Sequence, residues 1–435
     1  IWRLLSMSRA ISIKKPIGAA GRALRILALL ALVALATPAG AALGFGANFS
    51  HTTIDEGKAG LEIYLSAFNT GAASDVDVYL VARTPSGDFY SFRNGDWVRG
   101  IAPWLAGFAL PADFSLVGSR VTVLPALGAG LYTLYTGLAR PGTLDLLYLG
   151  EAPFLVVRGG SKGVRLGSLR LSTFNTTGLA GVGTYSEVRG RFIGSDGTLD
   201  ATRRVLDGIE PALDRCVFNE RPLNPFDGAG DLQLMTLDVG PSLLVQAMSD
   251  GVIVGKVSLY QSLFEEALGL FEYETSTGTE LPAVSVDPAL YYTFSAPGGS
   301  QLSGFRATVH GVGSLRLSHP TFYDHPGWDV ADDLDMRWNG NRGIGEVVVR
   351  AHAENHTLHC SVDCRFVDDG VGEIPAFLLQ KLWNCGRQSY QAVGGSLMVS
   401  RQRYQFFDTL RDELDYGVVS IRSADRLAGY WLGDQ

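Results

Sequence analysis

Apolar and polar residues alternate along most of the chain, in short segments separated by glycine, proline, asparagine and aspartate. Such breaks recur roughly every eight to twelve residues, which is typical of an all-β sandwich or barrel. The alternation is clearest in the segments 61–68, 75–82, 120–127 and 130–138. Asn94-Gly95 predicts a tight hairpin turn, because both central positions of a type I′ turn need a positive φ. The pattern therefore predicts an all-β fold.

The same pattern predicts how the chain divides into units. We expect a first sandwich over 44–157, a linker and connecting segment over 158–211, a second sandwich over 212–310 and a third over 311–435. The linker is expected to begin at 158–163, where glycine and charge cluster without an apolar period. Short helices are expected in 199–210 and near 375–383, where Pro375 suits a first helical turn.

The start of this linker also matches the G-x-S-x-G pattern of serine hydrolases, through Gly159, Ser161 and Gly163. That pattern exposes a nucleophile only on a strained turn between a buried strand and a helix. The residues that follow, 164–174, alternate as a strand does. The sequence thus favours a linker over a nucleophile at Ser161.

The first 41 residues predict an export signal. A positively charged stretch that includes Arg25 precedes the apolar run 26–36, and small residues follow it. The run is shorter than the about 20 residues that span a bilayer. We expect a signal peptide over 1–41, cleaved near Ala41 or Ala42, and a protein that is secreted, periplasmic or at the cell surface. No transmembrane segment is expected once the signal is removed.

Loss of this segment makes the protein more acidic. It removes six basic residues and no acidic ones, so the formal net charge moves from −8 to −14. Domains that bind nucleic acid carry concentrated basic patches, and none is visible in the sequence. We therefore expect no nucleic-acid partner.

The segment 351–364 packs three histidines and two cysteines into fourteen positions. A hairpin with its turn at Asn355-His356 places His352 opposite His359, and Ala351 opposite Cys360. Side chains alternate between the faces of a strand, so the histidines and the cysteines point in opposite directions. A mixed Cys/His zinc site, which needs four converging ligands, is thereby excluded in this register.

A weaker metal hypothesis survives on the polar face of this hairpin. His352 and His359 could chelate a metal as a pair, with Asp363 nearby. The alternative is two solvated histidines, and no cofactor is expected. A register slip of one residue would exchange the faces, so the interpretation depends on the turn.

Four cysteines follow the expected signal: Cys216, Cys360, Cys364 and Cys385. Exported proteins meet an oxidising compartment, where disulfides persist. Cys360 and Cys364 lie about 13 Å apart in one extended strand, beyond the ~7 Å that a disulfide spans. Each must therefore pair with Cys216 or Cys385, in either of two ways, or all four are buried thiols.

Two acidic clusters are candidates for chemistry. The segment 328–335 holds four aspartates, but it lacks the spacing and the closing glutamate of a calcium-binding EF-hand, so a solvated turn is expected. Glu265, Glu266, Glu272 and Glu274 could include the carboxylate pair of a glycoside hydrolase. Acidic edges of strands and loops are the alternative.

An aromatic cluster around the predicted hairpin of the first sandwich is the candidate binding surface. It comprises Tyr90, Phe92, Trp97 and Trp104. Exposed aromatic rings could stack on sugar rings or anchor a protein partner. The alternative is that the rings pack into the core of the hairpin and the sandwich.

Several stretches resemble known modules. In order, 287–309, 333–340, 368–382 and 394–402 resemble a family of secreted bacterial proteins built of tandem immunoglobulin-like β-sandwich modules, whose activity is unassigned. In the N-terminal unit, 75–90 and 130–145 are similar to a module of bacterial cell-surface proteins. The resemblance implies tandem immunoglobulin-like sandwiches with one or two short helices. It supplies no catalytic residues.

The resemblance also bears on the cysteines. Cys216 and Cys364 match positions where the resembling proteins carry cysteine, whereas Cys360 and Cys385 are additional. It therefore implies the pairs Cys216–Cys364 and Cys360–Cys385.

The leading hypothesis from the sequence is an exported, non-catalytic β-sandwich protein, acting as an interaction or structural module at the cell surface or in the periplasm. Its partner would be a protein or a glycan of the cell envelope. One alternative is a hydrolase that acts on glycan or polysaccharide. Another is a periplasmic metal-binding protein that uses His352 and His359.

Overall fold

The computed structural model describes residues 42–158, 160, 162–178, 181–206, 209–222, 232–265, 270–274, 284–321, 327–354, 358–386, 394–407 and 413–433. The expected signal peptide, Ser161 and the expected turn at Asn355-His356 lie outside these residues. The described part is 63% strand and 6% helix, which confirms the all-β prediction.

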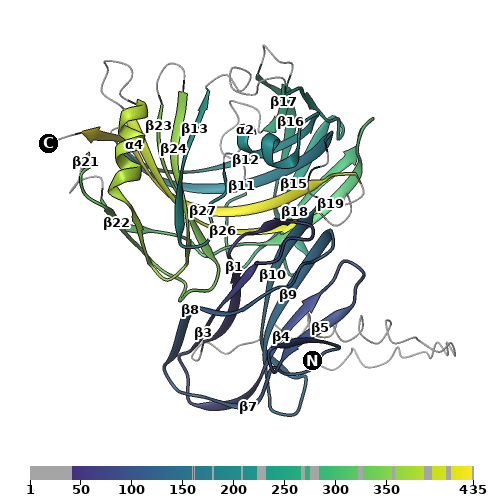
Figure 1. Ribbon diagram of the computed structural model, residues 1–435. Helices are drawn as coiled ribbons and strands as arrows, with labels where there is room; N and C mark the ends of the chain where they lie inside the picture. Colours follow the sequence, from purple (N-terminus) through teal and green to yellow (C-terminus); the bar gives the residue numbers. More distant parts are fainter. Residues whose placement is uncertain are drawn as a thin grey trace, which may run out of the picture.

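The first unit, drawn in purple and blue in the lower half of Figure 1, holds two sheets. Its described strands are β1 (Leu43–Phe49), β2 (Thr53–Asp55), β3 (Glu62–Asn69), β4 (Ser74–Arg83), β5 (Phe89–Arg93), β6 (Asp96–Arg99), β7 (Leu105–Leu110), β8 (Phe114–Val123), β9 (Gly130–Ala139) and β10 (Leu146–Val157). One sheet has the order β1-β3-β8, and the other has the order β2-β10-β9-β4-β5-β6 with β7 beside β4. Alternate apolar residues of both sheets meet in one core, where the rings of Phe49 and Phe154 lie 4.8 Å apart.

The hairpin β5–β6 turns where the sequence predicts it. Asn94 has φ 51° and Gly95 has φ 90°, the two positive values of a type I′ turn. Arg93 and Asp96 are the last paired residues before this turn.

The second unit contains the rest of the described chain. Its elements are β11 (Val164–Gly178), β12 (Gly181–Ser195), α2 (Leu199–Leu206), β13 (Arg215–Pro222), β14 (Leu234–Thr236), β15 (Ser242–Ser249), β16 (Val252–Glu265), β17 (Leu270–Glu274), β18 (Tyr291–Gly298), β19 (Ser303–His310), β20 (Leu317–His319), β21 (Gly327–Asp329), β22 (Leu334–Trp338), β23 (Glu346–Glu354), β24 (Leu358–Val367), β25 (Val371–Ile374), α4 (Ala376–Gly386), β26 (Gly394–Phe406) and β27 (Tyr416–Gly433). α2 lies within the segment 199–210, where a short helix is predicted. α4 overlaps the helix predicted near 375–383.

The sequence predicts 158–211 as a linker and connecting segment, but two strands of it, β11 and β12, lie at the centre of a large sheet. The described strands run in the order β13-β24-β23-β26-β27-β11-β12-β17-β16-β15-β18-β19, with β14 beside β12 and β21 beside β27. β11 pairs with β12 along its whole length and also runs parallel to β27. Strands from both the expected second and the expected third sandwich therefore share one sheet.

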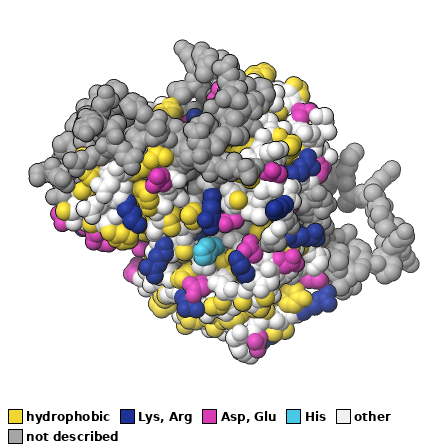
Figure 2. All heavy atoms as spheres, turned by 45° about the horizontal axis from the view of Figure 1, so that its top comes forward, with side chains coloured by type: hydrophobic (Ala, Val, Ile, Leu, Met, Phe, Trp, Pro, Cys, Tyr) yellow, Lys and Arg dark blue, Asp and Glu magenta, His cyan; other side chains and the backbone are white. Residues whose placement is uncertain are grey.

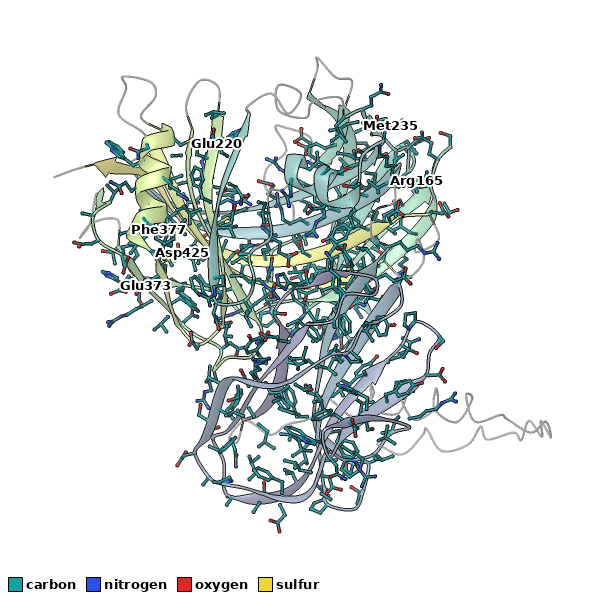
Figure 3. The ribbon with its side chains drawn as sticks, viewed as in Figure 1. Arg165, Glu220, Met235, Glu373, Phe377 and Asp425 are labelled. Carbon is teal, nitrogen blue, oxygen red and sulfur yellow. A yellow bond between two sulfur atoms is a disulfide. The ribbon has the colours of Figure 1, made fainter. Side chains whose placement is uncertain are left out.

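Two core clusters form on one face of this sheet. Ile421 and Leu427 lie on the same side of β27, but Ile421 packs with β15, β18 and β19, whereas Leu427 packs with β23, β24 and α4. The small sheet β20-β22-β25 covers the second cluster together with α4. Phe377 on α4 remains exposed and is labelled at the left of Figure 3.

The two units are joined by hydrogen bonds. Arg365 of β24 donates from Nη1 to the carbonyl oxygen of Ser50 at 3.1 Å. Asn48 donates from Nδ2 to the carbonyl oxygen of Gly343 at 3.2 Å, and the Tyr404 hydroxyl donates to that of Pro153 at 3.3 Å. β1, the residue that follows it and β10 are thereby joined to β24, β26 and the loop before β23.

Candidate functional site

The aromatic residues predicted as a binding surface are mainly part of the core of the first unit. Phe92 is 5% exposed, and Trp97 and Trp104 pack against the same core cluster. The ring centroid of Phe92 lies 5.3 Å from that of Trp97 and 6.0 Å from that of Trp104. Tyr90 is half-buried. The rings therefore do not form an open stacking platform, and core packing is the role that the structure shows.

The hairpin β23–β24 has a different register from the predicted one. Glu354, and not His352, lies opposite His359, so the predicted pairing is wrong by two residues. An even shift keeps every side chain on its predicted face. Ala351 and Cys360 accordingly lie in the buried core.

On the polar face, His352 and His359 lie diagonally, with 3.3 Å between Nε2 and Nδ1. Asp363 is no third ligand for them, because it is buried and is engaged by Arg350, Asn219 and Ser361. Within the described ranges, no group of three His, Cys, Asp or Glu side chains is arranged to hold a metal ion.

The four cysteines form two disulfides. Cys216 of β13 and Cys364 of β24 lie opposite each other, with Cα atoms 4.0 Å apart. Cys360 of β24 is bonded to Cys385 of α4, with 6.4 Å between Cα atoms. This is the pairing that the family resemblance implies. The first disulfide joins β13 to β24, and the second fixes α4 to the sheet.

Two members of the predicted acidic clusters have structural roles. Glu272 is 5% exposed and accepts a hydrogen bond from Arg191 Nε at 2.8 Å. Asp333 Oδ1 accepts the backbone N–H of Ala376 at 2.6 Å and so caps the start of α4. Glu266 and the side chain of Glu265 lie outside the described residues.

The surface turned forward in Figure 2 carries Lys and Arg side chains interspersed with Asp and Glu, around one histidine. The two signs of charge alternate there and do not separate into a basic patch. Neither described helix is long and apolar enough to cross a membrane.

A cleft of about 340 Å³ lies where the two units meet, and the sequence did not predict it. We call it the interunit cleft. Its wall from the first unit comes from β1 and β10, and its wall from the second unit comes from β23, β24, β26 and the loops around Gly311 and Asn341. Its polar and ionisable lining residues are Asn48, Tyr148, Glu151, Asn341, Glu346, Arg365, Arg401, Gln402, Arg403 and Tyr404.

One buried ion pair at the cleft joins Arg365 to Glu346. Arg365 is 2% exposed and donates from Nε to Glu346 Oε2 at 2.6 Å. Glu210 lies 3.7 Å from Nη1 of Arg365. Burial opposes ionisation of Glu210, but Arg203 and Arg365 outweigh it and lower its pKa to about 2. Burial also disfavours the charge on Arg365, but its two carboxylate neighbours raise its pKa overall.

A second buried ion pair joins Arg401 to Asp368. Arg401 donates to Asp368 from Nε and from Nη2, and also to the carbonyl oxygens of Gly313, Ser314 and Asn339. We call Arg365–Glu346 and Arg401–Asp368 the closed pairs, because in each of them opposite charges neutralise one another.

Arg403 and Glu151 differ from the closed pairs. Neither side chain makes a hydrogen bond or an ion pair within the described part of the chain. Both side chains line the cleft and are exposed to solvent there. The protein atoms around them lower the pKa of Arg403 and raise that of Glu151 by desolvation, while each charge favours ionisation of the other.

Two aromatic groups lie beside this open charge. Burial raises the pKa of Tyr148, and Arg403 acts in the opposite direction. Burial and the nearby Arg403 charge lower the pKa of His310 to about 4, so this histidine is neutral at neutral pH. The side chain of His310 packs on the ring of Tyr291, with centroids 3.9 Å apart.

Comparison with known proteins adds little to this geometry. No protein-family model matches the chain, and no characterised protein matches it in sequence. One solved structure, a tetra-tandem repeat in the extending region of a large adhesion protein, aligns with 91% of this chain and 75% of its own. The identity is 11% and the TM-score is 0.15, which is too low to support a shared fold. The structure shows the all-β architecture that the sequence resemblance implies.

Proposed function

We propose that this protein is an exported, non-catalytic interaction protein of the cell envelope, and that it binds its ligand in the interunit cleft. The observation that carries the proposal is the open charge of Arg403 and Glu151, next to pairs that are closed. No ion pair neutralises these two side chains in the described structure, so a ligand that carries complementary groups can bind them. Binding sites are concave and carry a few convergent polar groups of this kind.

The disulfides support export. Cys360 and Cys364 are both fully buried in the second unit, and each is bonded to a cysteine from another element. Structural disulfides form and persist in oxidising compartments. The predicted signal peptide is consistent with the same destination.

One observation favours the glycan hydrolase as a second candidate function. The cleft holds two carboxylates in different surroundings: Glu346 accepts hydrogen bonds from Arg365 and Gln402, whereas Glu151 has no such partner and its pKa is raised by burial. Carboxylates with contrasting environments can divide the roles of acid and base.

A thermal-shift screen with product analysis tests both functions. The protein without residues 1–41 is mixed with amino acids, short peptides and oligosaccharides of the cell envelope, next to the Arg403→Gln variant. Arg93→Gln is the matched control, because Arg93 is an exposed arginine at the hairpin turn. We expect at least one compound to raise the melting temperature of wild type and of the control, but not of Arg403→Gln, and to be recovered unchanged.

Two results contradict the proposal. Binding that does not depend on Arg403 would mean that the cleft is not the binding site. Release of shorter saccharides that is lost in Glu151→Gln would establish the hydrolase.

A further inference from the structure

The cleft lining holds one positive and one negative side chain outside the closed pairs, and this restricts the net charge of a complementary ligand. The closed pairs contribute no net charge, and what remains is one guanidinium, Arg403, and one carboxylate, Glu151. Arg83 also acts on Glu151 electrostatically but does not line the cleft. A ligand with a net negative charge would pair with Arg403 and leave Glu151 without a partner inside the cleft. A cationic ligand would do the reverse, and a neutral sugar would neutralise neither group.

Arg403 of β26 and Glu151 of β10 both line the cleft, and Tyr404 and Pro153 of the same two strands are joined by a hydrogen bond of 3.3 Å. No ion pair joins Arg403 to Glu151 in the described structure. A small molecule that carries a carboxylate and an ammonium group therefore offers a partner to each of them. Arg403 would receive a carboxylate, which a guanidinium binds through two parallel hydrogen bonds, and Glu151 would receive an ammonium group.

One further hydrogen-bond donor lines the cleft. The hydroxyl of Tyr148 has no hydrogen-bond partner in the described structure. It could donate to a carboxylate or carbonyl oxygen of the ligand. The volume of about 340 Å³ lies near the lower end of ligand sites, so the ligand is small.

We infer that the interunit cleft binds a small zwitterion with one carboxylate and one ammonium group, as in a free α-amino acid or a dipeptide. The inference rests on the proposed function, because it names the ligand class of the same site. Arg403 is the carboxylate contact and Glu151 is the ammonium contact.

Isothermal titration calorimetry at pH 7 tests the inference with defined probes. L-alanine and L-alanyl-L-alanine carry both charges, propionate lacks the ammonium group, ethylamine lacks the carboxylate, and galacturonate is an anionic sugar. We expect one of the first two to bind at one site per chain, about tenfold or more tightly than propionate or ethylamine, since each charge-assisted hydrogen bond contributes about that factor. The better of the two identifies the free amino acid or the peptide as the source.

The variants separate the two contacts. Glu151→Gln should weaken zwitterion binding about tenfold or more and leave propionate binding unchanged, whereas Arg403→Gln should weaken both. Arg93→Gln and Glu373→Gln are the matched controls and should bind as wild type does. Glu373 is exposed beside α4, at the left edge of Figure 3 and away from the junction of the units. Circular dichroism checks that each variant is folded, and Arg403→Lys replaces Arg403→Gln if the latter does not fold.

The outcomes distinguish the inference from the proposed function. If galacturonate or propionate binds as tightly as the zwitterions and Glu151→Gln has no effect, the cleft is an anion site. The inference then fails while the proposed function stands. If no probe binds to folded wild type, the inference fails, and the thermal-shift screen decides the proposed function separately.

Discussion

Glu210 connects three parts of the protein, and its removal should destabilise the fold in a pH-dependent way. Its Oε1 accepts a hydrogen bond from the Thr52 hydroxyl of the first unit at 2.6 Å, and its Oε2 accepts one from Arg203 Nη2 of α2 at 2.9 Å. Arg365 of β24 is its third neighbour. Burial alone would raise the pKa of Glu210, but the charges of Arg203 and Arg365 and the hydrogen bonds from Thr52 and Arg203 lower it to about 2.

The magnitude follows from the change in pKa between the unfolded and folded states. A fall from 4.5 to about 2 corresponds to about 3 kcal/mol of stability, at 1.36 kcal/mol per pKa unit. Because the pKa is lowered on folding, this stability is fully present above about pH 4.5 and is lost as the pH falls through about 2. Glu210→Gln, which cannot ionise, should therefore lower the free energy of unfolding by about 3 kcal/mol at pH 7. At pH 2 the difference from wild type should be much smaller.

Urea unfolding at pH 7, 4.5, 3 and 2, followed by circular dichroism, measures this difference. Glu373→Gln is the control, because the same chemical change at an exposed carboxylate should cost little at any pH. A loss of stability in Glu210→Gln that is equal at pH 7 and pH 2 would refute the reasoning. It would show that the amide disturbs packing and that the ionic contacts contribute nothing.

Three further predictions concern the disulfides, the hairpin turn and metal binding. Replacing both cysteines of the β13–β24 disulfide by alanine should cost more than the same change in the α4 disulfide, about 5 against about 3.5 kcal/mol in the chain-entropy model, because the loops span 148 and 25 residues. Urea unfolding measures both, and the reverse order would contradict this account. Gly95→Ala should lower the free energy of unfolding by about 1 kcal/mol, because the added methyl group has space but the positive φ of Gly95 disfavours alanine. Gly183→Ala is the control, because Gly183 also has space around it and lacks a positive φ. Equal effects of the two changes would contradict the turn assignment. Zinc added to chelator-treated protein should leave the melting temperature unchanged, whereas a saturable rise would revive the hypothesis of a metal site at the two hairpin histidines.

Local patterns predicted the parts of the fold that depend on neighbouring residues. The type I′ turn at Asn94-Gly95 requires a backbone conformation that this dipeptide favours, so the hairpin follows from the sequence alone. In β23–β24 the alternation predicted which residues are buried, but not the register. Two registers that differ by two residues bury the same side chains, so hydrophobicity does not distinguish them.

Pairings between distant segments could not be predicted in this way. Residues 158–163 contain glycine and charge, as a linker does, yet they lead into β11 at the centre of the large sheet. β11 takes its place by parallel pairing with β27, from Leu166 opposite Tyr416 to Gly178 opposite Ala428. Nothing within either segment specifies this partner, because the hydrogen bonds are made by backbone groups that every strand offers.

The same limit explains why the interunit cleft was missed. Arg401 and Arg403 are two residues apart on β26 and look equivalent in the sequence. They differ only in what other segments bring to them: Asp368 and three carbonyl groups enclose Arg401, whereas Arg403 meets Glu151 of the first unit across a gap. An arginine that a buried carboxylate neutralises stabilises the fold, and one that the fold leaves open is available to a ligand. Whether a charged residue belongs to the structure or to the binding site is therefore decided by the docking of the two units.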